Sequence, residues 1–264
     1  MTITGAILRN AVIYAAQLIT SHRQEIDALN VFPVPDGDTG TNMSMTITNA
    51  SREVRVKDDS ESVSAVASCV ASGLLRGARG NSGVILSLIF RGISKGLKGL
   101  DEADGAAIAS ALEHGSSSAY KAVMKPTEGT ILTVIRTASE YARKAVNDGE
   151  TDAVKVFDTG LEGAKAALAD TPNILPVLKK AGVVDAGGSG LVCIFTAMSD
   201  VFHGKEVNLD ADEAGEAKRE SGRTLRRQPL HLLRGVHLPP RERQGYPRAA
   251  RISRSYRRVR LRHG

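Results

Sequence analysis

Apolar residues recur along most of this chain at the spacing of an α-helix, and this pattern restricts the chain to an all-helical fold. In the opening segment, residues 5–27, apolar side chains return every three or four positions. No segment shows the convincing apolar–polar alternation of a half-buried strand. We therefore predict an all-α bundle of eight helices over residues 5–27, 39–54, 63–76, 81–96, 103–124, 130–147, 152–168 and 186–202.

Charge is distributed unevenly along the 264 residues, and this predicts where the folded domain ends. Residues 221–264 contain 13 arginines, no lysine and one acidic residue, Glu242, whereas residues 1–220 carry 22 basic and 28 acidic residues. Four prolines interrupt the arginine-rich part, which has no periodicity. We predict a folded domain over residues 1–205, an acidic linker over 206–220 and a disordered segment over 221–264.

The arginine-rich segment has two interpretations. A disordered basic arm of this kind binds nucleic acid or an anionic membrane surface. Arginine used to the exclusion of lysine is also typical of GC-rich DNA translated out of frame, and we favour such a frameshift product. A nucleic-acid partner is therefore not expected unless the arginine-rich segment is genuine.

The rest of the sequence is typical of a soluble, cytoplasmic protein. Cys69 and Cys193 lie far apart in apolar helical patterns, which predicts buried free thiols rather than a disulfide. No apolar run approaches the ~18 residues that a membrane span needs. Residues 1–10 lack the basic and apolar regions of a secretory signal.

The segment 30–43 contains more candidate ligand-binding residues than any other part of the chain. Two carboxylates, Asp36 and Asp38, lie two residues apart just before a predicted helix. Pro33 and Pro35 favour an extended backbone for the residues that precede them, so the carboxylates lie in a loop. Carboxylate oxygens are the ligands that magnesium prefers. The alternative is a solvated Asp-Gly turn.

Residues at the start of the second predicted helix are candidates for binding phosphate. Backbone N–H groups of a first helical turn bind anions, and the hydroxyls there add further donors. An ordinary threonine N-cap is the alternative, and both roles are compatible. The candidates are Thr39, Gly40, Thr41 and Asn42.

A second candidate for nucleotide binding is the glycine-rich start of the fourth predicted helix. Gly77, Gly80 and Gly83 flank Asn81 and Ser82, and small residues let the backbone approach a ligand. The Ser82 hydroxyl can donate to a phosphate. Spaced glycines alone are weak evidence, because helix C-caps also use glycine.

Two further helix starts carry candidate ligand-binding residues. Thr130 follows Glu128 at the start of the sixth predicted helix, and Asp185 and Gly187 stand at the start of the eighth. For Thr130 and Asp185, the alternative is a simple N-cap. Taken alone, the position of these residues at helix starts does not distinguish ligand binding from helix capping.

Four ordered segments together resemble the DhaL-type nucleotide-binding domain of dihydroxyacetone kinases, and more closely the N-terminal kinase domain of bacterial fatty acid kinases. The matching segments are residues 29–43, 76–87, 128–132 and 182–190. The resemblance covers roughly residues 5–203. It implies eight antiparallel helices in a closed barrel, with the nucleotide bound at one end by interhelical loops.

The resemblance also implies roles for individual residues. Asp36 and Asp38 match the metal ligands of the family, and a third ligand position falls on Asn30. The loop 80–83 matches the family's nucleotide-binding loop, and the segment around Thr130 contributes nucleotide contacts in relatives. The Asp185 segment resembles an Asp-Pro-Gly lid, with alanine in place of proline.

From these matches we expect a kinase module that depends on ATP and Mg²⁺. It would transfer the γ-phosphate to a fatty acid carboxylate on a DegV-type carrier protein and give an acyl phosphate. Asp36 and Asp38 would be the catalytic residues, through the metal. The alternatives are an L-type subunit of a dihydroxyacetone (glycerone) kinase and a truncated nucleotide-binding module without catalysis.

Overall fold

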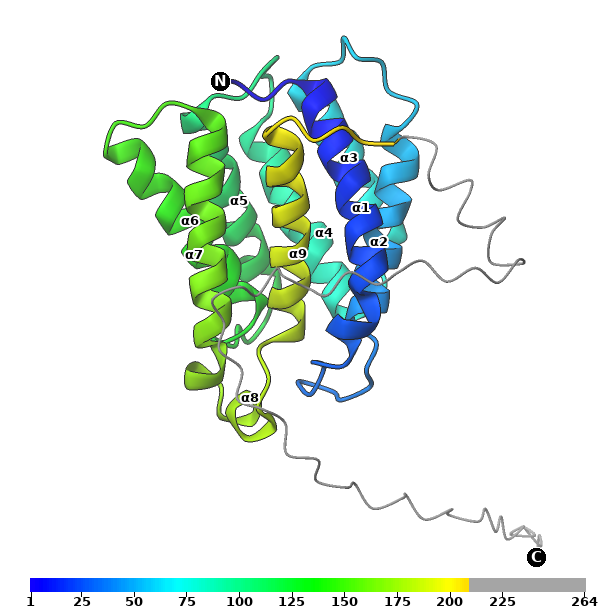
Figure 1. Ribbon diagram of the computed structural model, residues 1–264, viewed down its shortest axis with the longest axis vertical. Helices are drawn as coiled ribbons and strands as arrows, with labels where there is room; N and C mark the ends of the chain where they lie inside the picture. The colour runs from blue at the N-terminus through cyan, green and yellow to red at the C-terminus, as the bar shows by residue number, and fades with distance from the viewer. Residues whose placement is uncertain (209–264) are drawn as a thin grey trace, which may run out of the picture.

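A computed structural model describes residues 1–208, and all of the ordered elements within that range are helices (Figure 1). The predicted all-α class is therefore confirmed. Residues 209–264, which include most of the predicted linker and the whole arginine-rich segment, fall outside the described range. The helices are α1 (Gly5–Asp27), α2 (Thr39–Val54), α3 (Val63–Gly77), α4 (Gly80–Gly96), α5 (Gly105–Ala122), α6 (Ile131–Asn147), α7 (Ala153–Ile174), α8 (Pro176–Ala181) and α9 (Ala186–Phe202).

The eight long helices form a closed ring. Each helix from α1 to α7 packs against the next one along the chain, and α9 packs against both α7 and α1. Figure 1 shows these helices aligned along one axis, with α9 beside α1. Because neighbours alternate in direction, the connections that follow α1, α3, α5 and α7 all emerge at the same end of the ring, which we call the loop end.

The end of α7 differs from the prediction. We expected this helix to stop at residue 168, but it continues to Ile174 with Pro172 inside its last turn, and the short α8 follows. A proline has no N–H to donate to the carbonyl four residues earlier. Here the Thr171 hydroxyl donates to the Leu168 carbonyl instead, at 2.7 Å, so the helix continues without an unpaired oxygen.

The opposite end of the ring is closed by short backbone contacts. Ile3 pairs with Ala103 in an isolated antiparallel bridge, and the Ala153 N–H donates to the Met1 carbonyl. The Met1 ammonium group lies 2.8 Å from an Asp152 carboxylate oxygen. These contacts bring the start of the chain together with the starts of α5 and α7.

The core is built from Ala, Val, Leu and Ile, with Phe157, Phe195 and Phe202 clustered between α7 and α9. Cys193 is buried and Cys69 is half-buried, and both are free thiols. None of the helices in the described range is long and apolar enough to cross a bilayer.

Small residues let α4 and α5 approach closely. A Cβ atom added at Gly92 would lie 2.1 Å from the His114 carbonyl oxygen, which belongs to the backbone of α5. Real Cβ atoms do not come that close, so α4 would have to move away from α5. The ring therefore depends on the absence of a side chain at this crossing.

We expect Gly92→Ala to lower the free energy of unfolding by about 1–3 kcal/mol, which is the usual cost of overpacking. Helix propensity alone would favour alanine by about 1 kcal/mol, so the sign of the change separates the two effects. Urea unfolding followed by circular dichroism measures it. Lys95→Ala, on an exposed position of α4, is the control and should change stability little.

Candidate functional site

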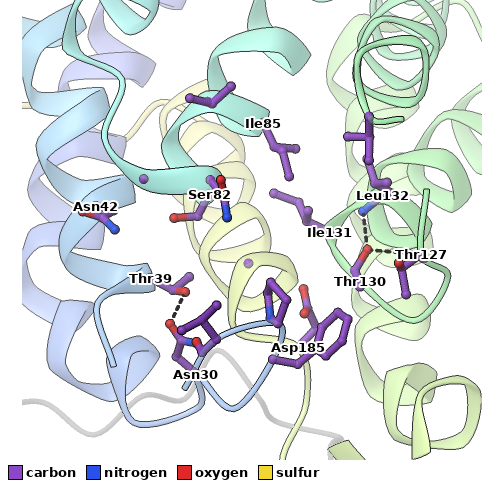
Figure 2. A pocket seen from close by; sticks show the side chains of 18 of the residues that line it. Asn30, Thr39, Asn42, Ser82, Ile85, Thr127, Thr130, Ile131, Leu132 and Asp185 are labelled. Carbon is purple, nitrogen blue, oxygen red and sulfur yellow. Dashed lines mark hydrogen bonds between the residues drawn. The ribbon is translucent and has the colours of Figure 1, made fainter. Parts of the chain in front are cut away.

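A cavity of about 600 Å³ opens at the loop end of the ring (Figure 2). Its volume falls in the range of small-molecule sites. It is lined by the starts of α2, α4, α6 and α9, together with the loops before α2 and α6, the N-cap residue of α9 and the end of α5. Of the residues predicted from the sequence, it brings together Asn30, Asp36, Asp38, Thr39, Asn42, Gly80, Asn81, Ser82, Thr130, Asp185 and Gly187.

Three predicted residues do not line this cavity: Gly40, Thr41 and Gly83. Gly40 packs against α1, where an added Cβ would lie 2.2 Å from the Arg23 carbonyl oxygen. Gly83 packs against α2, where an added Cβ would lie 2.3 Å from the Thr46 hydroxyl oxygen. Thr41 is hydrogen-bonded to α1. For these three, the structure shows roles in helix packing and capping.

Asn30 fastens the loop that carries the two aspartates. Its side-chain amide donates to the Val34 carbonyl at 2.8 Å, and its side-chain oxygen accepts from the Thr39 hydroxyl at 2.6 Å. The residue is 8 % exposed. Because Oδ1 of Asn30 already has a partner, Asp36 and Asp38 are better placed as metal ligands than Asn30 is.

The carboxylates of Asp36 and Asp38 have no protein partner within residues 1–208. Both line the cavity. The same range contains no group of three or more His, Cys, Asp or Glu side chains arranged to hold a metal ion. Magnesium, however, is often held by only one or two carboxylates, and water and phosphate oxygens fill its other positions. The pair therefore fits Mg²⁺ bound together with a phosphate ligand.

Neither α2 nor α4, which both begin at the cavity, is capped by the side chain of its own N-cap residue, unlike the other long helices of the described range. Gly80, at the start of α4, has a φ of +58°, and a Cβ there would lie 2.4 Å from the Asn42 amide nitrogen. A side chain at this position would thus be strained and would collide with α2. In Figure 2, Asn42 and Ser82 face the same space. Backbone N–H groups of a first turn that no cap occupies are suited to binding an anion.

Thr130 both caps α6 and lines the cavity. Its hydroxyl accepts from the Leu132 N–H at 3.4 Å and donates to the Thr127 carbonyl at 2.7 Å. The N-cap alternative is therefore observed, at a residue that also lines the cavity. The sequence motif alone could not separate the two roles.

Glu128 holds the loop before α6 in place. Its carboxylate accepts from the hydroxyls of Tyr120, at 2.8 Å, and Thr133, at 2.6 Å, and pairs with Arg136 at 3.2 Å. Partial burial acts to raise the pKa of Glu128, but the hydrogen bonds from Thr133, Tyr120 and Arg136 outweigh it and lower the pKa. The carboxylate thus remains charged and anchors the loop.

This anchored loop carries a residue that the sequence analysis missed. Lys125 is the only cationic side chain among the described residues that line the cavity. No motif marks it, but it belongs to the connection that follows the fifth helix, which alternation of helix direction assigns to the loop end. It adds a positive charge to a lining that includes three acidic residues, Asp36, Asp38 and Asp185.

Much of the cavity lining is apolar. It comes mainly from α4, α6 and the end of α5, with further residues from the aspartate loop. The apolar lining residues are Phe32, Pro33, Val34, Val84, Ile85, Leu88, Ala122, Val123, Ile131 and Leu132. An apolar lining beside polar helix starts suits a ligand with one flat hydrophobic part and one anionic part.

Asp185 is buried at the start of α9, where it is 5 % exposed. Its carboxylate accepts from the Gly188 N–H at 2.7 Å and caps the helix. Burial raises the pKa of Asp185 to about 6, although hydrogen bonds from the N–H groups of Gly188 and Ile131 act in the opposite direction. The N-cap role predicted as an alternative is present, and the residue also lines the cavity.

The raised pKa of Asp185 predicts a pH-dependent stability. Its pKa in the folded protein, about 6, lies above the ordinary value of 3.8, so the folded state binds the proton more tightly. The resulting stabilisation is complete below pH 3.8 and is lost as the pH rises through about 6. Asp185→Asn keeps an oxygen for the cap but cannot ionise. The free energy of unfolding of the variant minus that of the wild type should therefore rise by about 2–3 kcal/mol from pH 4 to pH 7. Urea unfolding at the two pH values measures this difference. A difference that does not change with pH would contradict this assignment.

Comparison with known proteins places the chain among longer relatives. It is 46% identical over 206 residues to Protein YloV of Bacillus subtilis strain 168, a match that covers 78% of this chain and 37% of YloV. It is 44% identical over 220 residues to an uncharacterized protein of Staphylococcus haemolyticus, covering 83% of this chain and 38% of that protein. The chain thus spans less than two fifths of the length of these relatives.

The fold is shared with a solved kinase structure. The crystal structure of the dihydroxyacetone kinase from C. freundii in complex with AMP-PNP and Mg²⁺ superimposes with a TM-score of 0.55 at 16% identity, covering 76% of this chain and 34% of that one. The native form of the same enzyme gives a TM-score of 0.51 at 19% identity, covering 74% and 34%. At such identities the match establishes the fold alone. The model of the DAK2 domain matches residues 33–200, well over half of the chain, and this chain is a member of the DAK2 domain family, the DhaL type that its motifs predict.

Proposed function

We propose that this chain is the nucleotide-binding kinase module of a fatty acid kinase, which uses ATP and Mg²⁺ to phosphorylate a carrier-bound fatty acid. The observation that carries the proposal is the meeting of two unpaired carboxylates, Asp36 and Asp38, with the starts of α2 and α4 in one cavity. Phosphoryl transfer requires chiefly that the donor be positioned and its charge neutralised. This cavity offers groups for both tasks.

The cavity can accommodate the two parts of a nucleotide separately. The apolar lining suits the base, since side chains such as Ile85 and Ile131 offer flat hydrophobic contact. The first turns of α2 and α4, with the Ser82 hydroxyl, would bind the phosphates. Lys125 would add a positive charge from the loop before α6. Together these groups would orient the terminal phosphate towards the open side of the cavity.

Asp36 and Asp38 would hold the magnesium ion. When bound, Mg²⁺ would supply positive charge that partly neutralises the phosphates and stabilises the leaving diphosphate. Asn30 would act on these two residues indirectly, by fixing the loop through Val34 and Thr39. The C. freundii kinase whose fold is shared was solved with AMP-PNP and Mg²⁺, which supports this choice of ligands.

The acceptor is proposed to be a carboxylate. A fatty acid is already ionised at neutral pH and needs no general base, and no histidine is among the described residues that line the cavity. The proline-rich version of the loop, residues 31–35, also resembles the fatty acid kinase branch. A DegV-type carrier would present the acyl group at the open side of the cavity.

One observation favours an alternative acceptor. Asp185 lines the cavity with its pKa raised to about 6, as suits a base that accepts a proton from a hydroxyl group. Dihydroxyacetone, the substrate class of the kinase with the shared fold, offers such a hydroxyl. Because the chain spans less than two fifths of its relatives, nucleotide binding without transfer is a further alternative.

Calorimetric titration of ADP into the full chain, with and without Mg²⁺, tests the core of the proposal. We expect Mg²⁺ to strengthen ADP binding by at least about tenfold, which is about 1.4 kcal/mol. Asp38→Asn should abolish this enhancement, because it removes one of the two carboxylates that would hold the ion. Asp101→Asn, on an exposed residue between α4 and α5 at the far end, is the matched control.

The same protein then distinguishes the acceptors. Acyl phosphate formed from ATP and a carrier-bound fatty acid reacts with hydroxylamine to give a hydroxamate, which is measured directly. Hydroxamate with the fatty acid, and no ADP release with dihydroxyacetone, is the expected result. ADP release with dihydroxyacetone alone would establish the alternative substrate. Folded protein that binds no ADP would contradict the proposed function altogether.

Lys125→Ala should weaken ADP binding about two- to fivefold, because an exposed lysine contributes at most about 1 kcal/mol to an ionic contact. The loss should shrink at high salt, since screening already weakens that contact. Lys121→Ala, on an exposed lysine in the last turn of α5 that does not line the cavity, is the control. Equal effects of the two substitutions would argue against a specific role for Lys125.

A further inference from the structure

Asp27 is bonded to the start of a helix that it does not belong to. It is the last residue of α1, and its two carboxylate oxygens accept from Thr41, the third residue of α2. One oxygen accepts from the Thr41 N–H at 2.9 Å, and the other accepts from the Thr41 hydroxyl at 2.7 Å. The N–H of the third residue of a helix is the donor that an N-cap side chain normally satisfies.

Asp38 occupies the N-cap position of α2 but does not cap the helix. Aspartate is among the best capping residues, so this is unusual. The backbone of Asp38 is also atypical, with φ −122° and ψ 3°. The residues that do cap the other long helices, such as Asp104 and Asp152, have an extended backbone.

We propose that Asp27 is a positioning residue, which takes over the cap of α2 and thereby leaves the Asp38 carboxylate available to the cavity. The inference rests on the proposed function to the extent that Asp38 then serves as a metal ligand. Two carboxylates compete for one helix start, and the one from α1 occupies it. Without Asp27, Asp38 would turn back to cap its own helix.

The packing between α1 and α2 makes this contact possible. Gly40 lies so close to the last turns of α1 that an added Cβ would lie 2.8 Å from the Ile26 Cβ. This approach brings the end of α1 within hydrogen-bonding distance of Thr41. Gly40, a candidate phosphate-binding residue from the sequence, thus has the role of bringing Asp27 close to Thr41.

A double-mutant cycle on thermal stability, measured on the full chain in the absence of divalent ions, tests the competition itself. Asp38→Ala should change the Tm little in the wild-type background, because Asp38 caps nothing there. In the Asp27→Ala background, the same substitution removes the replacement cap and should lower the Tm by about 2–4 °C more. Equal effects of Asp38→Ala in the two backgrounds would overturn the proposal.

The second arm uses Mg²⁺ and ADP as probes. Asp27→Ala should weaken the Mg²⁺-dependent part of ADP binding about fivefold. Mg²⁺ would then have to break the new cap made by Asp38, and the loss of a helix cap typically corresponds to a factor of this size in an equilibrium constant. Asp27→Asn keeps an oxygen for the Thr41 N–H and should restore most of the affinity. If Asp27→Ala does not fold, Asp27→Asn alone tests the capping role. Retained Mg²⁺-dependent ADP binding in this variant supports the role, because the amide oxygen can still accept from the Thr41 N–H. Weakened binding would show that Asp27 acts through its charge and would overturn the role.

The two arms separate this inference from the proposed function. If the wild-type protein bound no Mg²⁺ and ADP, the proposed function would fail, while the stability cycle would still report whether Asp27 and Asp38 compete for the cap. If Mg²⁺ and ADP bound as expected but the cycle were additive, the function would stand and the role of Asp27 would fall.

Discussion

The alternation of helix direction around a closed ring is the constraint on which the rest of this structure depends. It brings four connections, far apart in the sequence, to one end, where the starts of α2, α4, α6 and α9 line one cavity. The ring closes only because helices approach closely, as α4 and α5 do at Gly92. Close helix packing and the assembly of the site are therefore consequences of the same arrangement.

Helix capping divides these starts into two groups. Thr130 and Asp185 cap their own helices and still face the cavity, so their side chains combine a structural and a ligand-facing position. The N-cap residues of α2 and α4 make no such bond. In α2 the Thr41 N–H is bonded instead to Asp27 of α1, and the carboxylate of the N-cap residue Asp38 lines the cavity. The distinction matters because an N–H group already bonded to a cap is a weaker donor to a ligand.

The sequence predicted the all-helical fold and the positions of its long helices, because apolar spacing records which face of each helix is buried. It misjudged the end of α7, where the Thr171 hydroxyl compensates for Pro172 in a way that periodicity does not reveal. Of the residues that the motifs proposed for the site, all but Gly40, Thr41 and Gly83 line the cavity. They missed Asp27 and Lys125, whose importance comes from contacts between segments. They also could not show that the side chain of Asn30 is already hydrogen-bonded to Thr39 and Val34.

The path of the chain after α9 has a consequence for any larger assembly. This helix starts at the cavity with Asp185 as its cap and runs away from it for 17 residues, a length of about 25 Å. Beyond it, the Asn208 carbonyl accepts from the side chain of Gln17 on α1, so the described chain leaves the ring away from the loop end (Figure 1). If a further domain follows such a ring in the same chain, it begins away from the loop end and would have to reach back along the outside of the ring to act on a ligand in the cavity. Whether that domain reaches the cavity would then depend on whether its linker is long enough to cover the length of the ring.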